Sequence, residues 1–102
     1  MNLSKLREEI SKRASNSFVK CKKKLTVETN EERIGLKSLF HSLRMIDFGI
    51  QIAETGRIYD FTASNHYLYD IFEIGPNWDK LKEKYQPIYN QLSSKFREVA
   101  PK

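Results

Sequence analysis

The segment from Thr29 to Gly56 constrains the fold of this chain more than any other. It begins with Thr29 and Glu32, which have the spacing of a helix capping box. It ends at Gly56, a residue type that readily takes the left-handed conformation in which many helices close. Apolar residues recur at helical spacing between these two ends, and no proline interrupts them. The segment therefore predicts one long helix.

On a helical wheel this segment has apolar residues on two opposite sides and only small residues in a third sector. Two of the small residues are glycines, and each costs about 1 kcal/mol in a helix relative to alanine. A small sector lets a neighbouring helix approach closely, and a helix with this distribution is surrounded by others. We therefore predict a buried central helix. The broad apolar face consists of Leu36, Leu39, Phe40, Leu43, Ile46 and Ile50. The opposite apolar group consists of Ile34, Met45, Phe48 and Ile52. The small sector consists of Gly35, Ser38, Ser42, Gly49 and Ala53.

Three further helices are expected around this one. An apolar stripe from Ser4, a potential N-cap, to Leu25 predicts the first, and a shorter one begins at Ser64 or Asn65. The last begins at Asn77, and its stripe continues across Pro87, which predicts a kink and not a break. The prediction is an all-α, four-helix bundle-like single domain over residues 1–102.

Cysteine and histidine usage, together with hydropathy, excludes several classes of protein. Cys21 is the one cysteine, so an internal disulfide is excluded, and a single thiol fits a reducing cytosol. With two histidines a metal site is not expected, and the chain has no cofactor-binding or catalytic motif. No apolar run approaches the roughly 20 residues that span a bilayer, and the N-terminal residues lack the apolar core of a signal peptide. We therefore expect a cytoplasmic protein without cofactor or membrane attachment.

Positive charge is concentrated near the N-terminus. Residues 1–28 contain eight Lys or Arg and three Glu, whereas residues 29–102 contain ten residues of each sign. The whole formal charge of +5 therefore belongs to the first quarter of the chain. Such a patch attracts polyanions, although a lysine run is also typical of a solvated helix face. The densest run consists of Lys20, Lys22, Lys23 and Lys24.

The sector left over on the central helix carries Lys37, His41 and Arg44, at positions i, i+4 and i+7. Two interpretations stay open. The long side chains could cover apolar neighbours while their charges stay in water. Alternatively, the three form an anion-binding row in which Arg44 grips a phosphate or carboxylate with two hydrogen bonds.

Asp47 falls on the apolar face of the same helix, where a carboxylate must be paired or protonated. Arg44, Arg57 or a tyrosine hydroxyl could reach it, and we interpret Asp47 as a buried structural acid. An enzymatic site around His41 and Asp47 is a weaker alternative, because the wheel puts them on different faces and no known motif supports them.

The stretch KSLFHSLR (37–44), followed by Gly49 and ETGRI (54–58), resembles the C-terminal helical region of a family of predicted nucleotidyltransferases. Their catalytic domains are of DNA-polymerase-beta type, and some are associated with RNA repair. Catalysis in that family depends on an N-terminal Gly-Ser loop and paired aspartates that hold metal ions, and this sequence contains neither. The resemblance therefore implies a helical accessory half, in which Lys37, His41 and Arg44 would face the phosphates of a nucleotide or nucleic acid.

The first hypothesis is thus a non-catalytic helical module that binds RNA, another nucleic acid or nucleotide phosphates, with a nucleotidyltransferase catalytic domain as a partner. The lysine run and Arg57 would add to the attraction, and the row on the central helix would make fixed contacts. The alternative belongs to another class: a protein-interaction module or self-associating helical scaffold, favoured by the wide apolar coverage of the central helix.

Overall fold

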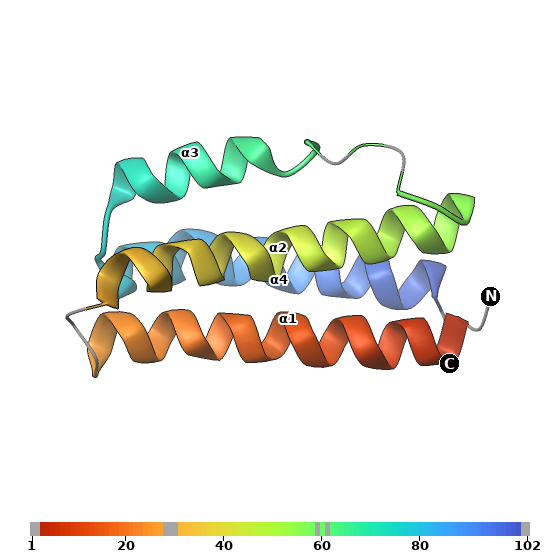
Figure 1. Ribbon diagram of the computed structural model, residues 1–102, viewed down its shortest axis with the longest axis horizontal. Coiled ribbons are helices and arrows are strands. Elements are labelled where there is room, and N and C mark those ends of the chain that lie inside the picture. The colour runs from red at the N-terminus through yellow and green to blue at the C-terminus, as the bar shows by residue number, and fades with distance from the viewer. Residues whose placement is uncertain (1–2, 28–30, 59, 61, 101–102) are drawn as a thin grey trace.

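The computed structural model describes residues 3–27, 31–58, 60 and 62–100, and these residues form four helices and no strand. Consecutive helices run in opposite directions along the bundle (Figure 1). The predicted all-α, four-helix bundle-like fold is therefore confirmed. The helices are α1 (Leu3–Thr26), α2 (Glu32–Thr55), α3 (Asn65–Ile74) and α4 (Trp78–Val99).

α2 is the central helix. It packs against each of the other three, most extensively against α1, whereas α1 and α3 do not touch. Figure 1 shows α2 between α1 and α3, with α4 behind it. Eleven residues of α2 are buried, compared with three in α4, which has nearly the same length. The broad apolar face and most of the small sector are in this buried set, as predicted.

The second apolar group of α2 is not buried, which corrects the prediction that neighbouring helices cover this side of α2 as well as its broad apolar face. Ile34 is exposed, and Met45, Phe48 and Ile52 are only half-buried. Three neighbours cannot cover the whole circumference of a helix, so one sector of α2 stays open to solvent. The sector that stays open is the one that carries the cationic row.

The glycines of α2 mark the places where other helices come closest. A Cβ atom at Gly49 would lie 2.9 Å from two ring atoms of Phe96 and 3.0 Å from Ile10, and one at Gly35 would lie 3.0 Å from the Cβ of Lys24. Ser42 lies between them, is fully buried, and its Oγ donates to the carbonyl oxygen of Ala14 at 2.9 Å. The predicted close approach to the small sector is confirmed for α1, and α4 contributes Phe96.

One predicted helix start is wrong, and another lies outside the described residues. α1 already includes Leu3, so Ser4 lies inside its first turn and is not its N-cap. α2 begins at Glu32 with Glu31 as its N-cap, and the side chain of Glu31 makes no capping hydrogen bond. Thr29, the expected start, lies outside the described residues. Glu31 pairs instead with Lys24 of α1, and this contact holds the entrance of α2 against the end of α1.

The remaining helix ends follow the sequence closely. Gly56 ends α2 in the left-handed conformation, with a φ of 84°. Ser64 precedes α3 without making a side-chain cap, and the side chain of Asn77 accepts a hydrogen bond from the Lys80 amide at 3.2 Å. α4 continues through Pro87 without a break, as predicted, and a bend there stays a prediction.

Candidate nucleic-acid interface

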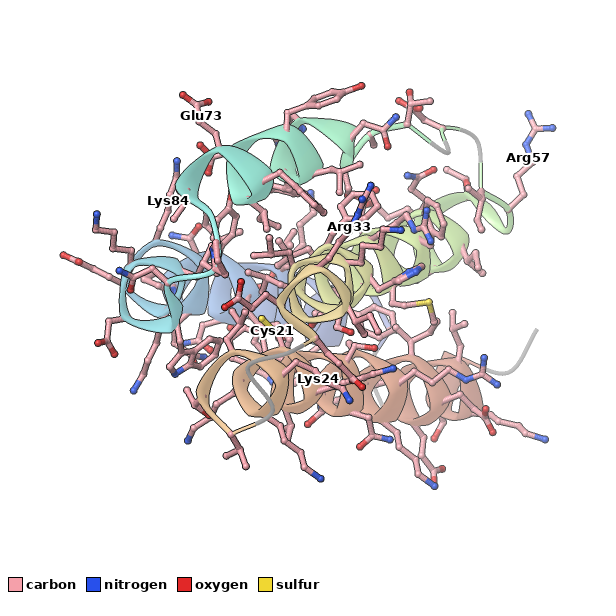
Figure 2. The ribbon with its side chains drawn as sticks, turned by 60° about the vertical axis from the view of Figure 1, so that its left-hand side comes forward. Cys21, Lys24, Arg33, Arg57, Glu73 and Lys84 are labelled. Atoms are coloured by element: carbon pink, nitrogen blue, oxygen red, sulfur yellow. The ribbon has the colours of Figure 1, made fainter. Side chains whose placement is uncertain are left out.

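The row on α2 occupies the open sector of the central helix. Lys37 and His41 are exposed and Arg44 is half-buried, all on the same side of the helix. The structure therefore brings together the three residues that the sequence singled out. It also adds Arg33, one turn before Lys37 and likewise exposed (Figure 2). The sequence contained the signal for Arg33, because it continues the same spacing by four residues toward the helix start.

Arg44 is held in place by three of its neighbours. Its Nη2 lies 2.8 Å from Nδ1 of His41. Its guanidinium carbon lies 5.0 Å from the centre of the Phe40 ring and 5.7 Å from that of Phe48. Such contacts between a cation and aromatic rings are attractive. The guanidinium is thus oriented before any ligand binds, which lowers the entropic cost of binding.

Arg44 is nevertheless poorly satisfied for a guanidinium with five N–H donors. Its Nε is buried and has no hydrogen-bond partner in the described part of the chain. Within that part, no carboxylate forms an ion pair with it either. A half-buried cation without a counter-ion favours an anionic ligand.

The contact with Arg44 determines the protonation state of His41. A guanidinium can only donate hydrogen bonds, so Nδ1 of His41 must accept, and the imidazole is neutral with its proton on Nε2. Partial burial lowers the pKa of His41 below its ordinary value, and the nearby charges of Arg44, Lys20 and Lys37 lower it further. His41 therefore contributes a neutral donor to the row near pH 7.

α1 contributes further cations to the same surface. Lys20 is close enough to His41 to lower its pKa. Arg13, also on α1, lines a shallow depression together with Asn16, Ser17 and His41. Arg13 and Lys20 are seven residues apart, which is the same separation as that of Lys37 and Arg44 on α2. The seam between α1 and α2 thus has a cationic pair on each side. Arg13 was missed from the sequence, although its spacing to Lys20 was visible there.

The lysine run of α1 does not form one surface. Successive residues of a helix point about 100° apart, so four lysines within five positions are spread around α1. Lys20 faces the α2 seam, and Lys22 and Lys23 are exposed elsewhere on α1. Lys24 forms an ion pair with Glu31, and its side chain is only 17% exposed. Lys24 thus already has a counter-ion, and its attraction for polyanions stays a prediction.

Arg57 is not part of the row. It follows α2 and points into solvent at the end of the molecule opposite Lys24 (Figure 2). Its backbone oxygen accepts a hydrogen bond from Thr55 Oγ1 at 2.9 Å. Arg57 lies beyond the end of α2 and therefore far along the helix axis from Arg44. Its contribution to the attraction for polyanions stays a prediction.

Asp47 is half-buried and not fully buried, which corrects the sequence-based prediction. The residue that binds it is Gln51, whose Nε2 donates to Asp47 Oδ2 at 2.9 Å. The buried Gln51 also exchanges two hydrogen bonds with the backbone of Asp60, each of 2.9 Å. Asp47 therefore helps to fix the connector after α2, and it does not share a partner with His41. Gln51 could not be singled out from the sequence, because an amide on a helix has many potential partners.

Cys21 is fully buried, and burial raises the pKa of its thiol to about 12. A packed, protonated thiol is not a nucleophile. Among the described residues, no three His, Cys, Asp or Glu side chains gather as metal ligands would. In that part of the chain, none of the four helices has the length and apolar character that a membrane crossing requires.

Comparison with protein-family models, with curated proteins and with solved structures found no match to this chain.

Proposed function

We propose that this chain is a non-catalytic helical module that binds nucleic-acid phosphates along the seam between α1 and α2. The observation that carries the proposal is Arg44, a guanidinium oriented by His41 and two aromatic rings and paired with no carboxylate in the described residues. Lys37 and Lys20 lie close enough to affect the same imidazole.

The length of the row favours a polymer over a single phosphate. Lys37 and Arg44 are separated by seven residues, or about 10 Å of helix axis at 1.5 Å per residue. A row of this length can reach more than one phosphate of the same strand, whereas a lone phosphate would occupy only part of it. RNA is the preferred polymer, because the family that KSLFHSLR resembles includes members associated with RNA repair. In keeping with that resemblance, a separate nucleotidyltransferase domain would supply the catalysis.

The test compares single substitutions in a binding assay with a short fluorescent single-stranded RNA. Lys37→Gln and Arg44→Gln should each weaken binding about tenfold or more, because a hydrogen bond to a charged group contributes about 1.5–3 kcal/mol. Lys95→Gln is the matched control: it removes the same charge from an exposed position on α4 and should leave the affinity unchanged. Equal affinities for all four proteins would contradict the proposal.

A self-associating or protein-binding scaffold is the second candidate, and one observation favours it. Tyr69 and Phe72 lie three residues apart on α3 and are 72% and 37% exposed. Large apolar side chains that share an exposed helix face are typical of contact surfaces. Light scattering over a range of concentrations tests self-association: a mass that rises with concentration and falls on Tyr69→Ser would support it, and a constant monomer mass would contradict it.

A further inference from the structure

A second cleft lies between α1 and α4, on the other side of α1 from the cationic row. Ser11 and Ser15 of α1 form one wall, and Tyr89, Ser93 and Arg97 of α4 form the other. The cleft has a volume of about 300 Å³, at the lower end of the range of about 300–1,000 Å³ for small-molecule sites. Its walls come from the middle of α1 and the second half of α4.

Short polar side chains keep this cleft open. At the seam between two packed helices, apolar or long side chains normally close the gap, whereas here serines stand on both sides. The cleft reaches down to Ile46 of α2 and to Phe96, each only 1% exposed, which form an apolar floor. The walls thus supply hydroxyl groups, and the floor supplies an apolar surface.

The polar groups of the cleft converge, and their net charge is positive. The hydroxyl of Tyr89 interacts with those of Ser15 and Ser93, and Nη2 of Arg97 donates to Ser94 Oγ at 3.2 Å. The described residues that line the cleft include Arg97 but no carboxylate. Toward the start of α1 the groove continues to Arg7 and Glu8.

We propose that this cleft binds a small sugar phosphate. The phosphate would lie against Arg97 at the mouth, because a guanidinium binds phosphate oxygens with directed hydrogen bonds. The sugar hydroxyls would exchange hydrogen bonds with Ser15, Ser93 and Tyr89, each of which can both donate and accept. The volume corresponds to about ten water molecules at roughly 30 Å³ each, which suits a small organic phosphate better than a lone anion.

The test is a titration of the isotope-labelled protein with ribose 5-phosphate, followed by the NMR shifts of backbone amides. We expect saturable shifts at Ser15, Ser93 and Arg97, and weaker binding of ribose or inorganic phosphate alone. Arg97→Gln, at an exposed position, should weaken binding about tenfold. Ser93→Ala should weaken ribose 5-phosphate binding less than Arg97→Gln does. The amide spectrum of each free variant should match that of the unaltered protein away from the substitution, which checks that the fold is kept.

Lys37→Gln is the matched control, because it removes one cation from the row and none from the cleft. It should leave ribose 5-phosphate binding unchanged. The test of the cleft is therefore independent of whether the row on α2 binds RNA. The inference is overturned if the shifts appear along α2 around Lys37 and not in the cleft, or if no saturation occurs. It is equally overturned if Arg97→Gln binds the sugar phosphate as tightly as the unaltered chain.

Discussion

At the scale of single residues, the pair of His41 and Arg44 determines the chemistry of the proposed interface. The sequence predicted a row of three cations, because spacing alone determines which residues share a helix face. It could not predict that His41 would be a neutral acceptor for Arg44, since that depends on side-chain rotamers and on the aromatic rings beneath the guanidinium. The three predicted residues are therefore two cations and a histidine that can gain a proton, and Arg33 adds a third cation to the row.

RNA binding should become tighter as the pH falls through the titration range of His41. In the free protein its pKa lies below the ordinary value of 6.5. Protonation at Nδ1 ends the contact with Arg44 Nη2, which can then bind the phosphate beside the imidazolium. A bound phosphate therefore raises that pKa, so binding takes up a proton and low pH favours the complex. Each unit of rise corresponds to about tenfold in affinity at low pH. NMR titration of His41 with and without RNA measures the rise directly.

The control for this pH dependence is His41→Gln, which keeps a neutral donor and cannot titrate. Its RNA affinity should change far less between pH 5 and pH 8, the range in which histidines titrate. If the pKa of His41 did not move when RNA was added, or if His41→Gln kept the full pH dependence, the proposed contact would be wrong.

At the scale of helices, the sequence predicted the packing of α2 better than that of α3. The small sector of α2 predicted a close contact with another helix, because two helices can approach closely only where the residues between them have short side chains. α3 has one buried side chain, Ile71, and is held to α4 by Tyr85 and Lys84, which both bind Asp70. Such long-range polar contacts leave no periodic pattern in a sequence, so the sequence could not predict them.

Replacing Gly49 with alanine should destabilise the bundle. The added methyl group would lie 2.9 Å from the buried ring of Phe96, which has little room to move. Overpacking a core costs about 1–3 kcal/mol, while alanine regains about 1 kcal/mol of helix propensity. We expect a net loss of about 1 kcal/mol in the free energy of unfolding, measured by urea denaturation. Glu54→Ala, at an exposed position on the same helix, is the control, and a more stable Gly49→Ala would contradict the close contact.

Replacing Asp70 with asparagine should loosen α3 without unfolding the other helices. Lys84 and the Tyr85 hydroxyl hold the pKa of Asp70 below its ordinary value of 3.8. This contact therefore contributes fully above that value and is lost as the pH falls through the lower, folded-state value. Amide hydrogen exchange should be faster in α3 for Asp70→Asn, with α1 unaffected. Unchanged exchange in α3 would show that apolar packing alone holds it.

At the scale of the whole molecule, charge and packing both favour the proposed interface on one side of the bundle. Residues 1–28 carry the net charge of +5, and Leu3–Thr26 among them form α1, directly beside the open sector of α2. The sequence showed this asymmetry, but it could not show that Lys24 pairs with Glu31. It also could not show that Arg13 and Lys20 would face Lys37 and Arg44 across one seam, since the relative rotation of two helices depends on their packing.

The salt dependence of RNA binding tests the central claim most directly. For a single strand, the slope of log affinity against log salt is about −0.7 for each phosphate neutralised. If Lys37 and Arg44 each neutralise one, the double variant Lys37→Gln with Arg44→Gln should have a slope shallower by about 1.4. We predict that change, with the slope of Lys95→Gln unaltered. A double variant with the slope of the unaltered protein, or an affinity insensitive to salt, would contradict phosphate binding by the row on α2.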